Sequence, residues 1–184
     1  MTVSSPSLAE RCLAIDFLLL DVDGVMTDGV IAVDDNGVET KHFHVRDGSA
    51  IALWRRLGKR VGILSGRRAK AVDIRAAELG ISPVIQGVAE KAAPFANLLN
   101  TFHLDAKTIA YMGDDLADLP VLGSVGLASS PQDAAIEVRD RVHYVTGARG
   151  GFGAVRELVE VILKHQGLWD GEVNRLCGLT LAPD

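Results

Sequence analysis

The chain has 184 residues, of which 48% are hydrophobic and 23% charged, and its formal net charge is −5 at pH 7. This size favours one domain, and the proportions of hydrophobic and charged residues are those of an ordinary globular protein. The negative charge argues against nucleic acid as the main partner, because binding a phosphate backbone needs basic clusters. No apolar run approaches the roughly 20 residues needed to cross a bilayer, so we expect no membrane partner.

The two ends of the chain give weak signals. Residues 1–10 are expected to be a flexible lead-in, since Lys and Arg are absent before any hydrophobic run, unlike a secretory signal. Cys12 and Cys177 lie near opposite ends and are expected to be free thiols in a reducing, cytoplasmic compartment. Residues 166–184 mix glycines with apolar side chains, and we assign no structure to this tail.

Short apolar runs alternate with segments of helical pattern along the chain. This alternation predicts an α/β fold, a doubly wound, Rossmann-like parallel sheet with helices on both faces. The runs are apolar throughout, as strands buried on both sides require. The expected strands are Ile15–Asp21, Arg60–Leu64, Pro83–Gln86, Thr108–Gly113, Ser124–Ala128 and Val142–Val145; the expected helices are Gly48–Leu57, Arg68–Leu79, Lys91–Asn100, Leu116–Leu122, Asp133–Arg139 and Gly153–Lys164.

Residues 28–47 interrupt the alternation. Two β-prone runs, 29–33 and 38–45, flank an Asn36-Gly37 turn signal, which predicts a β-hairpin inserted after the first strand. An isolated hairpin is marginal in water, so it must pack on its own domain or on a neighbouring chain. It is too short to form an independent cap domain.

Two carboxylates, Asp21 and Asp23, follow the first strand directly. Open α/β sheets bind their ligands at the carboxyl ends of the strands. Like charges this close raise each other's pKa unless a cation separates them. The pair therefore indicates a Mg²⁺ site, or a nucleophile beside a proton carrier, although two turn carboxylates would give the same pattern.

The second strand is followed by Ser65, Gly66 and Arg67. A serine hydroxyl and the N–H groups at the start of a helix favour a phosphate there. Arg67 is placed at the helix start, where a cation is unfavourable for the helix dipole, and this conflict favours a functional role. The alternative is that Ser65 only caps the helix.

Two further strand ends carry charged residues. Lys91 begins a predicted helix and is a candidate partner for a phosphate or a carboxylate, although a lone lysine is usually a surface group. Asp114, Asp115 and Asp118 follow the next strand, where helix capping is the alternative role. Three acids at one strand end are costly without a cation such as Mg²⁺.

All of these segments follow parallel strands, so the topology brings them to one edge of one sheet. Together they offer a nucleophile, an acid/base, phosphate donors, a cation and metal ligands. This combination predicts hydrolysis of a phosphate monoester through an aspartyl-phosphate.

In the order and spacing of these segments the chain resembles the haloacid dehalogenase superfamily of phosphohydrolases. The resemblance implies Asp21 as nucleophile and Asp23 as general acid/base, with Ser65 and Lys91 holding the phosphoryl group. It implies Mg²⁺ bound by the Asp21 side chain, the Asp23 carbonyl and the Asp114 side chain. Asp115 and Asp118 would support these ligands from behind.

A narrower resemblance covers most of the chain, including Val25–Gly29, the hairpin, Gln86-Gly87 and Gly150–Glu157. In these segments the chain is similar to the 3-deoxy-D-manno-octulosonate 8-phosphate phosphatases, a branch of the superfamily without a cap domain that serves lipopolysaccharide biosynthesis. Members are Mg²⁺-dependent homotetramers in which the hairpins pack together and a neighbouring subunit closes the site over the phosphorylated sugar acid. The substrate-binding residues this implies are Asp23, His44, Val45, Arg46, Asp47, Gly48, Gly66, Arg67, Arg75 and Lys91.

Two positions depart from the family pattern. His44 stands where the family usually has Asn, and Ala52 stands where a basic residue would meet the carboxylate of the sugar. Hydrolysis of nonulosonate 9-phosphates, or of sugar phosphates in general, is therefore kept as an alternative function. A non-catalytic phosphatase-like tetramerisation module is the alternative from another class, and a phosphoryl-transferring mutase is a further one.

Overall fold

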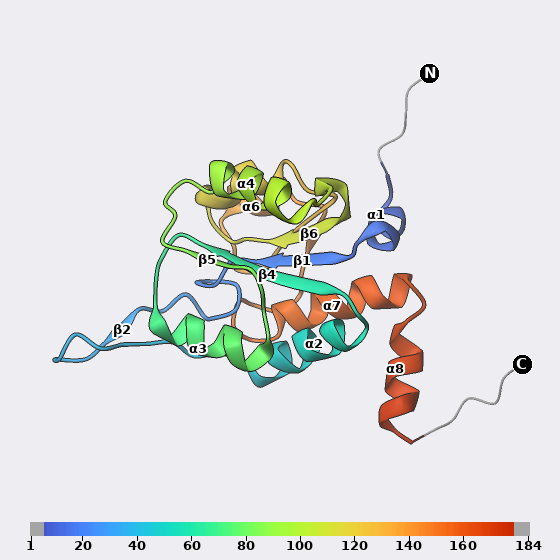
Figure 1. The fold of residues 1–184 in the computed structure, drawn as a ribbon, viewed down its shortest axis with the longest axis horizontal. Coiled ribbons are helices and arrows are strands. Elements are labelled where there is room, and N and C mark those ends of the chain that lie inside the picture. Colours follow the sequence, from blue (N-terminus) through green and yellow to red (C-terminus); the bar gives the residue numbers. More distant parts are fainter. Residues whose placement is uncertain (1–5, 179–184) are drawn as a thin grey trace, which may run out of the picture.

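The computed structural model describes residues 6–178, and its centre is a sheet of six parallel strands (Figure 1). Their spatial order is β5-β4-β1-β6-β7-β8, so β1 lies in the middle, between β4 and β6. The order reverses at β1, which makes its carboxyl end the topological switch point. The strands are β1 (Phe17–Leu20), β4 (Arg60–Ser65), β5 (Val84–Gln86), β6 (Ile109–Met112), β7 (Leu127–Ser130) and β8 (Tyr144–Val145).

The side chains of β1 enter two separate cores because successive residues of a strand point to opposite faces. Leu18 and Leu20 pack into one hydrophobic cluster, and Phe17 and Leu19 into the other. All four are at most 1% exposed, which explains the unbroken apolar run in the sequence. The predicted doubly wound α/β fold without a cap domain is confirmed.

Helices cover both faces of this sheet (Figure 1). The cluster on one face includes residues of α1 (Leu8–Ala14), α2 (Val45–Arg56), α3 (Lys70–Leu79) and α7 (Ala154–His165). The cluster on the other includes residues of α4 (Ala92–Phe102), α5 (Leu119–Leu122) and α6 (Ile136–Arg139). The remaining helices are α8 (Trp169–Leu176) and two short 3₁₀ turns, η1 (Ala106–Thr108) and η2 (Leu116–Asp118).

The predicted hairpin is present and projects from the body of the molecule (Figure 1). Its strands, β2 (Ala32–Val33) and β3 (Glu39–Thr40), pair antiparallel, and Asp34 organises the turn by accepting hydrogen bonds from the N–H groups of Asn36 and Val38. Four apolar side chains on it are more than half exposed: Val30, Ile31, Val33 and Val38. No other segment within residues 6–178 therefore covers these apolar side chains of the hairpin.

Several helix boundaries differ from the sequence predictions. Helix α1 begins at Leu8, inside the segment expected to be flexible, because Ser7 and Glu10 form a capping box. Helix α8 lies in the tail that was left without structure. Helix α2 begins three residues earlier than predicted, at Val45, which ends the hairpin insertion before residue 47. Helix α3 begins later, at Lys70, so Arg67 does not open a helix.

Both cysteines are free, Cys12 buried and Cys177 exposed, as predicted. None of the helices between residues 6 and 178 has the length and apolar character that crossing a membrane requires.

Candidate active site

A pocket of about 220 Å³ lies at the carboxyl ends of β1, β4 and β6, beside the switch point. Asp21 follows β1 directly, and its N–H donates to the carbonyl of Met112, which continues the pairing with β6. Ser65 is the last residue of β4 and is buried. The structure thus brings together most of the predicted site residues, and those lining the pocket are Asp21, Asp23, Ser65, Gly66, Arg67, Lys91, Asp114, Asp115 and Asp118.

Lys91 is the buried cation of this pocket, with a side chain only 2% exposed. It precedes α4, and its Nζ lies 3.0 Å from Asp21 Oδ1 and donates to Asp118 Oδ1 at 2.6 Å. A lysine buried this deeply is found where carboxylates compensate its charge. The usual surface role of a lone lysine is therefore wrong for Lys91.

Asp118 is held in place by donors from several elements. The hydroxyl of Tyr111 donates to its Oδ1 at 2.6 Å, where Lys91 also donates. The backbone N–H groups of Asp114 and Asp115 donate to its Oδ2 at 2.9 and 3.2 Å. These four hydrogen bonds make Asp118 a structural support for the loop after β6.

The pocket contains more carboxylates than lysines, and the pKa values of two of these carboxyl groups are raised. Burial raises the pKa of Asp21 to about 6, against the opposing charge of Lys91. Burial also raises the pKa of Asp114 to about 8, and the charges of Asp21 and Asp118 add to the rise. Burial works against the charge of Lys91, but the two carboxylates beside it raise its pKa above the ordinary value. The site therefore has an excess of negative charge that a cation would relieve.

The carboxylate arrangement fits a divalent cation. Carboxylate oxygens of Asp21, Asp114 and Asp118 lie within 4.8 Å of one another. Asp21 Oδ1 is buried, and its ion pair with Lys91 Nζ at 3.0 Å lacks hydrogen-bond geometry, so within residues 6–178 it has no regular donor. Since the oxygens of Asp118 are occupied by protein donors, Asp21 and Asp114 are the side chains placed to hold the ion. Hard oxygen ligands of this kind suit Mg²⁺.

Two glycines allow the close packing of this site. A Cβ on Gly24, whose φ is +80°, would lie 2.0 Å from Asp114 Oδ2. The Asp114 carboxylate therefore lies directly against the backbone that follows Asp23. A Cβ on Gly150 would lie 1.8 Å from the carbonyl oxygen of Gly24, so the turn at residues 150–151 packs directly against the backbone of the same loop.

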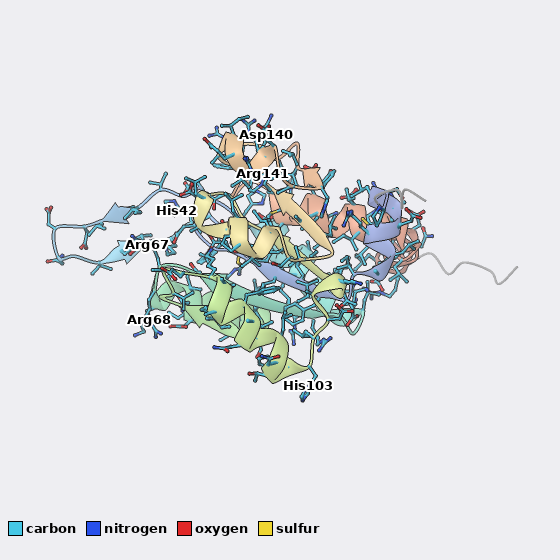
Figure 2. The ribbon with its side chains drawn as sticks, turned by 90° about the horizontal axis from the view of Figure 1, so that it is seen from above. His42, Arg67, Arg68, His103, Asp140 and Arg141 are labelled. Atoms are coloured by element: carbon cyan, nitrogen blue, oxygen red, sulfur yellow. The ribbon has the colours of Figure 1, made fainter. Side chains whose placement is uncertain are left out.

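Asp23 is in contact with the base of the hairpin. Lys41 Nζ donates to Asp23 Oδ1 and lies 2.9 Å from Glu39 Oε1. Arg67 Nε lies 3.7 Å from Asp23 Oδ2, and its Nη2 donates to Glu39 at 2.9 Å. Figure 2 shows Arg67 near the point where the hairpin joins the body. Lys41 and Glu39 were not predicted from the sequence, and neither was Tyr111.

The other predicted substrate-binding residues do not line this pocket. Asp47 is buried and accepts hydrogen bonds from the N–H groups of Gly153 and Arg156, so it caps α7. Gly48 lies against Arg75, since a Cβ there would be 2.2 Å from Arg75 Nη2. His44, Val45 and Arg46 are at the start of α2, where the last two are exposed.

No protein-family model matches the chain. It is 42% identical over 166 residues to the 3-deoxy-D-manno-octulosonate 8-phosphate phosphatase KdsC of Salmonella typhimurium, covering 90% of this chain and 88% of the relative. The crystal structure of this phosphatase from Yersinia pestis matches with a TM-score of 0.87 at 41% identity, over 89% of each chain.

The Moraxella catarrhalis phosphatase, solved in complex with magnesium ion, phosphate ion and KDO, matches with a TM-score of 0.89 at 36% identity. The match covers 91% of this chain and 97% of that one. The chain therefore belongs to the 3-deoxy-D-manno-octulosonate 8-phosphate phosphatase family, in the haloacid dehalogenase superfamily.

Proposed function

We propose that this protein hydrolyses the phosphate monoester of a sugar acid, 3-deoxy-D-manno-octulosonate 8-phosphate or a close relative, through an aspartyl-phosphate on Asp21. The observation that carries the proposal is the burial of Asp21 beside Lys91, in one pocket with Asp23 and Ser65. The resemblance assigns such a step to lipopolysaccharide biosynthesis, and the two free cysteines fit the reducing cytoplasm.

The reaction has two steps. An oxygen of Asp21 attacks phosphorus, the bond from phosphorus to the sugar oxygen breaks, and the leaving oxygen takes a proton from Asp23. Water then attacks the phosphorus and gives its proton to Asp23, while the bond between Asp21 and phosphorus breaks. Inorganic phosphate leaves, and Asp23 is protonated again for the next cycle.

The remaining residues of the pocket position the phosphoryl group. Lys91, the Ser65 hydroxyl and the N–H of Gly66 would bind its oxygens, and Arg67 would contact the substrate at the mouth. Bound Mg²⁺, held by the side chains of Asp21 and Asp114 and the carbonyl of Asp23, would neutralise charge that develops on the transferring group. Asp115 and Asp118 would keep that ligand loop in place.

A substrate screen tests this function. Purified protein with Mg²⁺ is assayed for phosphate release from phosphorylated eight- and nine-carbon keto acids, simple sugar phosphates and an aryl phosphate. We expect the eight-carbon acid to have the highest kcat/KM and chelation of Mg²⁺ to abolish turnover. Equal rates for all substrates would leave a general phosphatase, and no turnover on any of them would leave a non-catalytic module.

We also infer that the protein is a homotetramer assembled through the hairpin. The exposed Val30, Ile31, Val33 and Val38 support this, because uncovered apolar side chains on a projecting hairpin favour burial against another copy. Val45 and Arg46, exposed at the start of α2, would then reach the site of a neighbouring subunit. Sedimentation at micromolar concentration should give a tetramer that Val33→Asp dissociates; a wild-type monomer would contradict the assembly.

A further inference from the structure

Lys41 has a buried side chain that the two-step reaction above does not use. This side chain is 2% exposed, although Lys41 directly follows the short strand β3 in a mostly exposed hairpin. Lysine is among the residues least often buried, and it is buried where charges compensate it. Here the compensating groups are Glu39 in the hairpin and Asp23 in the active site.

The two oxygens of Asp23 have different surroundings. Oδ1 accepts the hydrogen bond from Lys41. Oδ2 is buried and receives no hydrogen bond from any group within residues 6–178, and Arg67 Nε lies 3.7 Å from it. Arg67 is 46% exposed, so it restrains this carboxylate far less than Lys41 does. One oxygen is therefore fixed by the hairpin, and the other is left free for a reacting group.

We propose that Lys41 is a positioning residue, which holds the carboxyl group of Asp23 so that Oδ2 faces the leaving oxygen of the substrate. The inference rests on the acid/base role of Asp23 proposed above. Proton transfer requires heavy atoms about 2.6–3.2 Å apart, and a displacement of about 1 Å can cost roughly 10²-fold in rate. The hairpin would thus serve the active site of its own chain, apart from any role in assembly.

The alternative is that Lys41 only anchors the hairpin by neutralising Glu39. The two roles differ in how the effect of Lys41→Met depends on the leaving group. A sugar alkoxide needs the proton from Asp23, whereas p-nitrophenolate leaves readily without one. A mere anchor would affect both substrates alike.

The kinetic test compares kcat/KM of the wild type and Lys41→Met on the sugar-acid phosphate and on p-nitrophenyl phosphate. We expect a loss of about 10²-fold on the first and less than about 5-fold on the second. Lys59→Met is the matched control, because Lys59 is also a mostly buried lysine, but it donates to the carbonyl of Ile15 at the opposite end of the sheet. It should change neither value. Equal losses on the two substrates would overturn the inference.

A double-mutant cycle adds a readout that an anchor would not give. In an Asp23→Asn background, Lys41→Met should change kcat/KM by less than about 3-fold, since there is no longer an acid to position. A full, multiplicative loss in that background would overturn the inference. If Lys41→Met does not fold, Lys41→Gln keeps a polar side chain there and is expected to show the same dependence on the leaving group.

A crystal structure of the Lys41 variant decides the question without an activity assay. We expect the carboxyl group of Asp23 to rotate away from its wild-type orientation while Asp21, Lys91 and Asp114 stay in place. An unmoved Asp23 would overturn the inference. A wild type without Mg²⁺-dependent turnover would reject the proposed function instead, and the orientation of Asp23 would still decide the role of Lys41.

Discussion

Asp21→Asn should lower kcat on the sugar-acid phosphate by at least about 10³-fold, because an amide cannot replace the carboxylate as nucleophile. The substitution nearly preserves shape, and it removes one charge from a pocket where burial already raises the pKa of Asp21 to about 6. We therefore expect the thermal unfolding temperature of the variant to equal or exceed that of the wild type. Steady-state kinetics and calorimetry on the same preparation measure both quantities.

Asp16→Asn is the matched control for this variant. Asp16 immediately precedes β1 and Asp21 immediately follows it, so the same substitution is made at the two ends of one strand. Asp16 is half exposed and pairs with Arg60, far from the pocket. Its variant should keep wild-type kcat. Ordinary turnover by Asp21→Asn would show that Asp21 is not the nucleophile.

Lys91→Met should lower both turnover and stability. The ammonium of Lys91 lies within 3.0 Å of carboxylate oxygens of Asp21 and Asp118, and it also donates to the hydroxyl of Tyr111 at 3.2 Å. Removing one partner of a buried ion pair leaves an uncompensated charge and costs about 3–5 kcal/mol. For a chain of this size that corresponds to a fall of roughly 10 °C in Tm. We expect kcat to fall by at least about 10²-fold, since the phosphoryl group loses its cation.

Added Mg²⁺ should restore part of the lost stability of Lys91→Met, because the ion would neutralise the same carboxylates. Lys70→Met, at the exposed first position of α3, is the control and should behave like the wild type. Calorimetry with and without Mg²⁺ measures the effect. A variant with wild-type Tm and kinetics would contradict the role of Lys91 in holding the site together.

The sheet could be predicted closely from the sequence, because strands buried on both faces leave an unbroken apolar signal. The run predicted as Arg60–Leu64, for example, is the strand Arg60–Ser65, whereas the strand predicted at Ser124–Ala128 lies further along the chain, at Leu127–Ser130. The amphipathic helices near the two ends of the chain, α1 and α8, were harder to predict. Helix α8 contains Gly171, which masks its helical pattern, and it is anchored by Trp169 stacking on Arg156 of α7, a contact between distant segments. Helix α1 was missed although its Ser7–Glu10 capping box is visible in the sequence.

The acidic pocket could be predicted because parallel topology alone brings strand ends together. Asp21, Ser65 and Asp114 each lie at or just beyond the carboxyl end of a strand, so no side-chain detail was needed to group them. Lys41 could not be grouped this way, since its position depends on how the base of the hairpin joins the body beside Asp23. Tyr111 lies inside β6 and resembles any core aromatic residue until its hydroxyl is seen to contact Asp118.

The most direct test is a crystal structure of the wild type grown with Mg²⁺ and beryllofluoride, a mimic of a phosphoryl group on aspartate. We expect beryllium bonded to an oxygen of Asp21, close to Lys91 and Ser65, and Mg²⁺ coordinated by Asp21, Asp114 and the carbonyl of Asp23. The Asp21→Asn protein should bind no beryllofluoride. Beryllofluoride on another residue, or Mg²⁺ bound away from these carboxylates, would contradict the phosphatase chemistry assigned to this pocket.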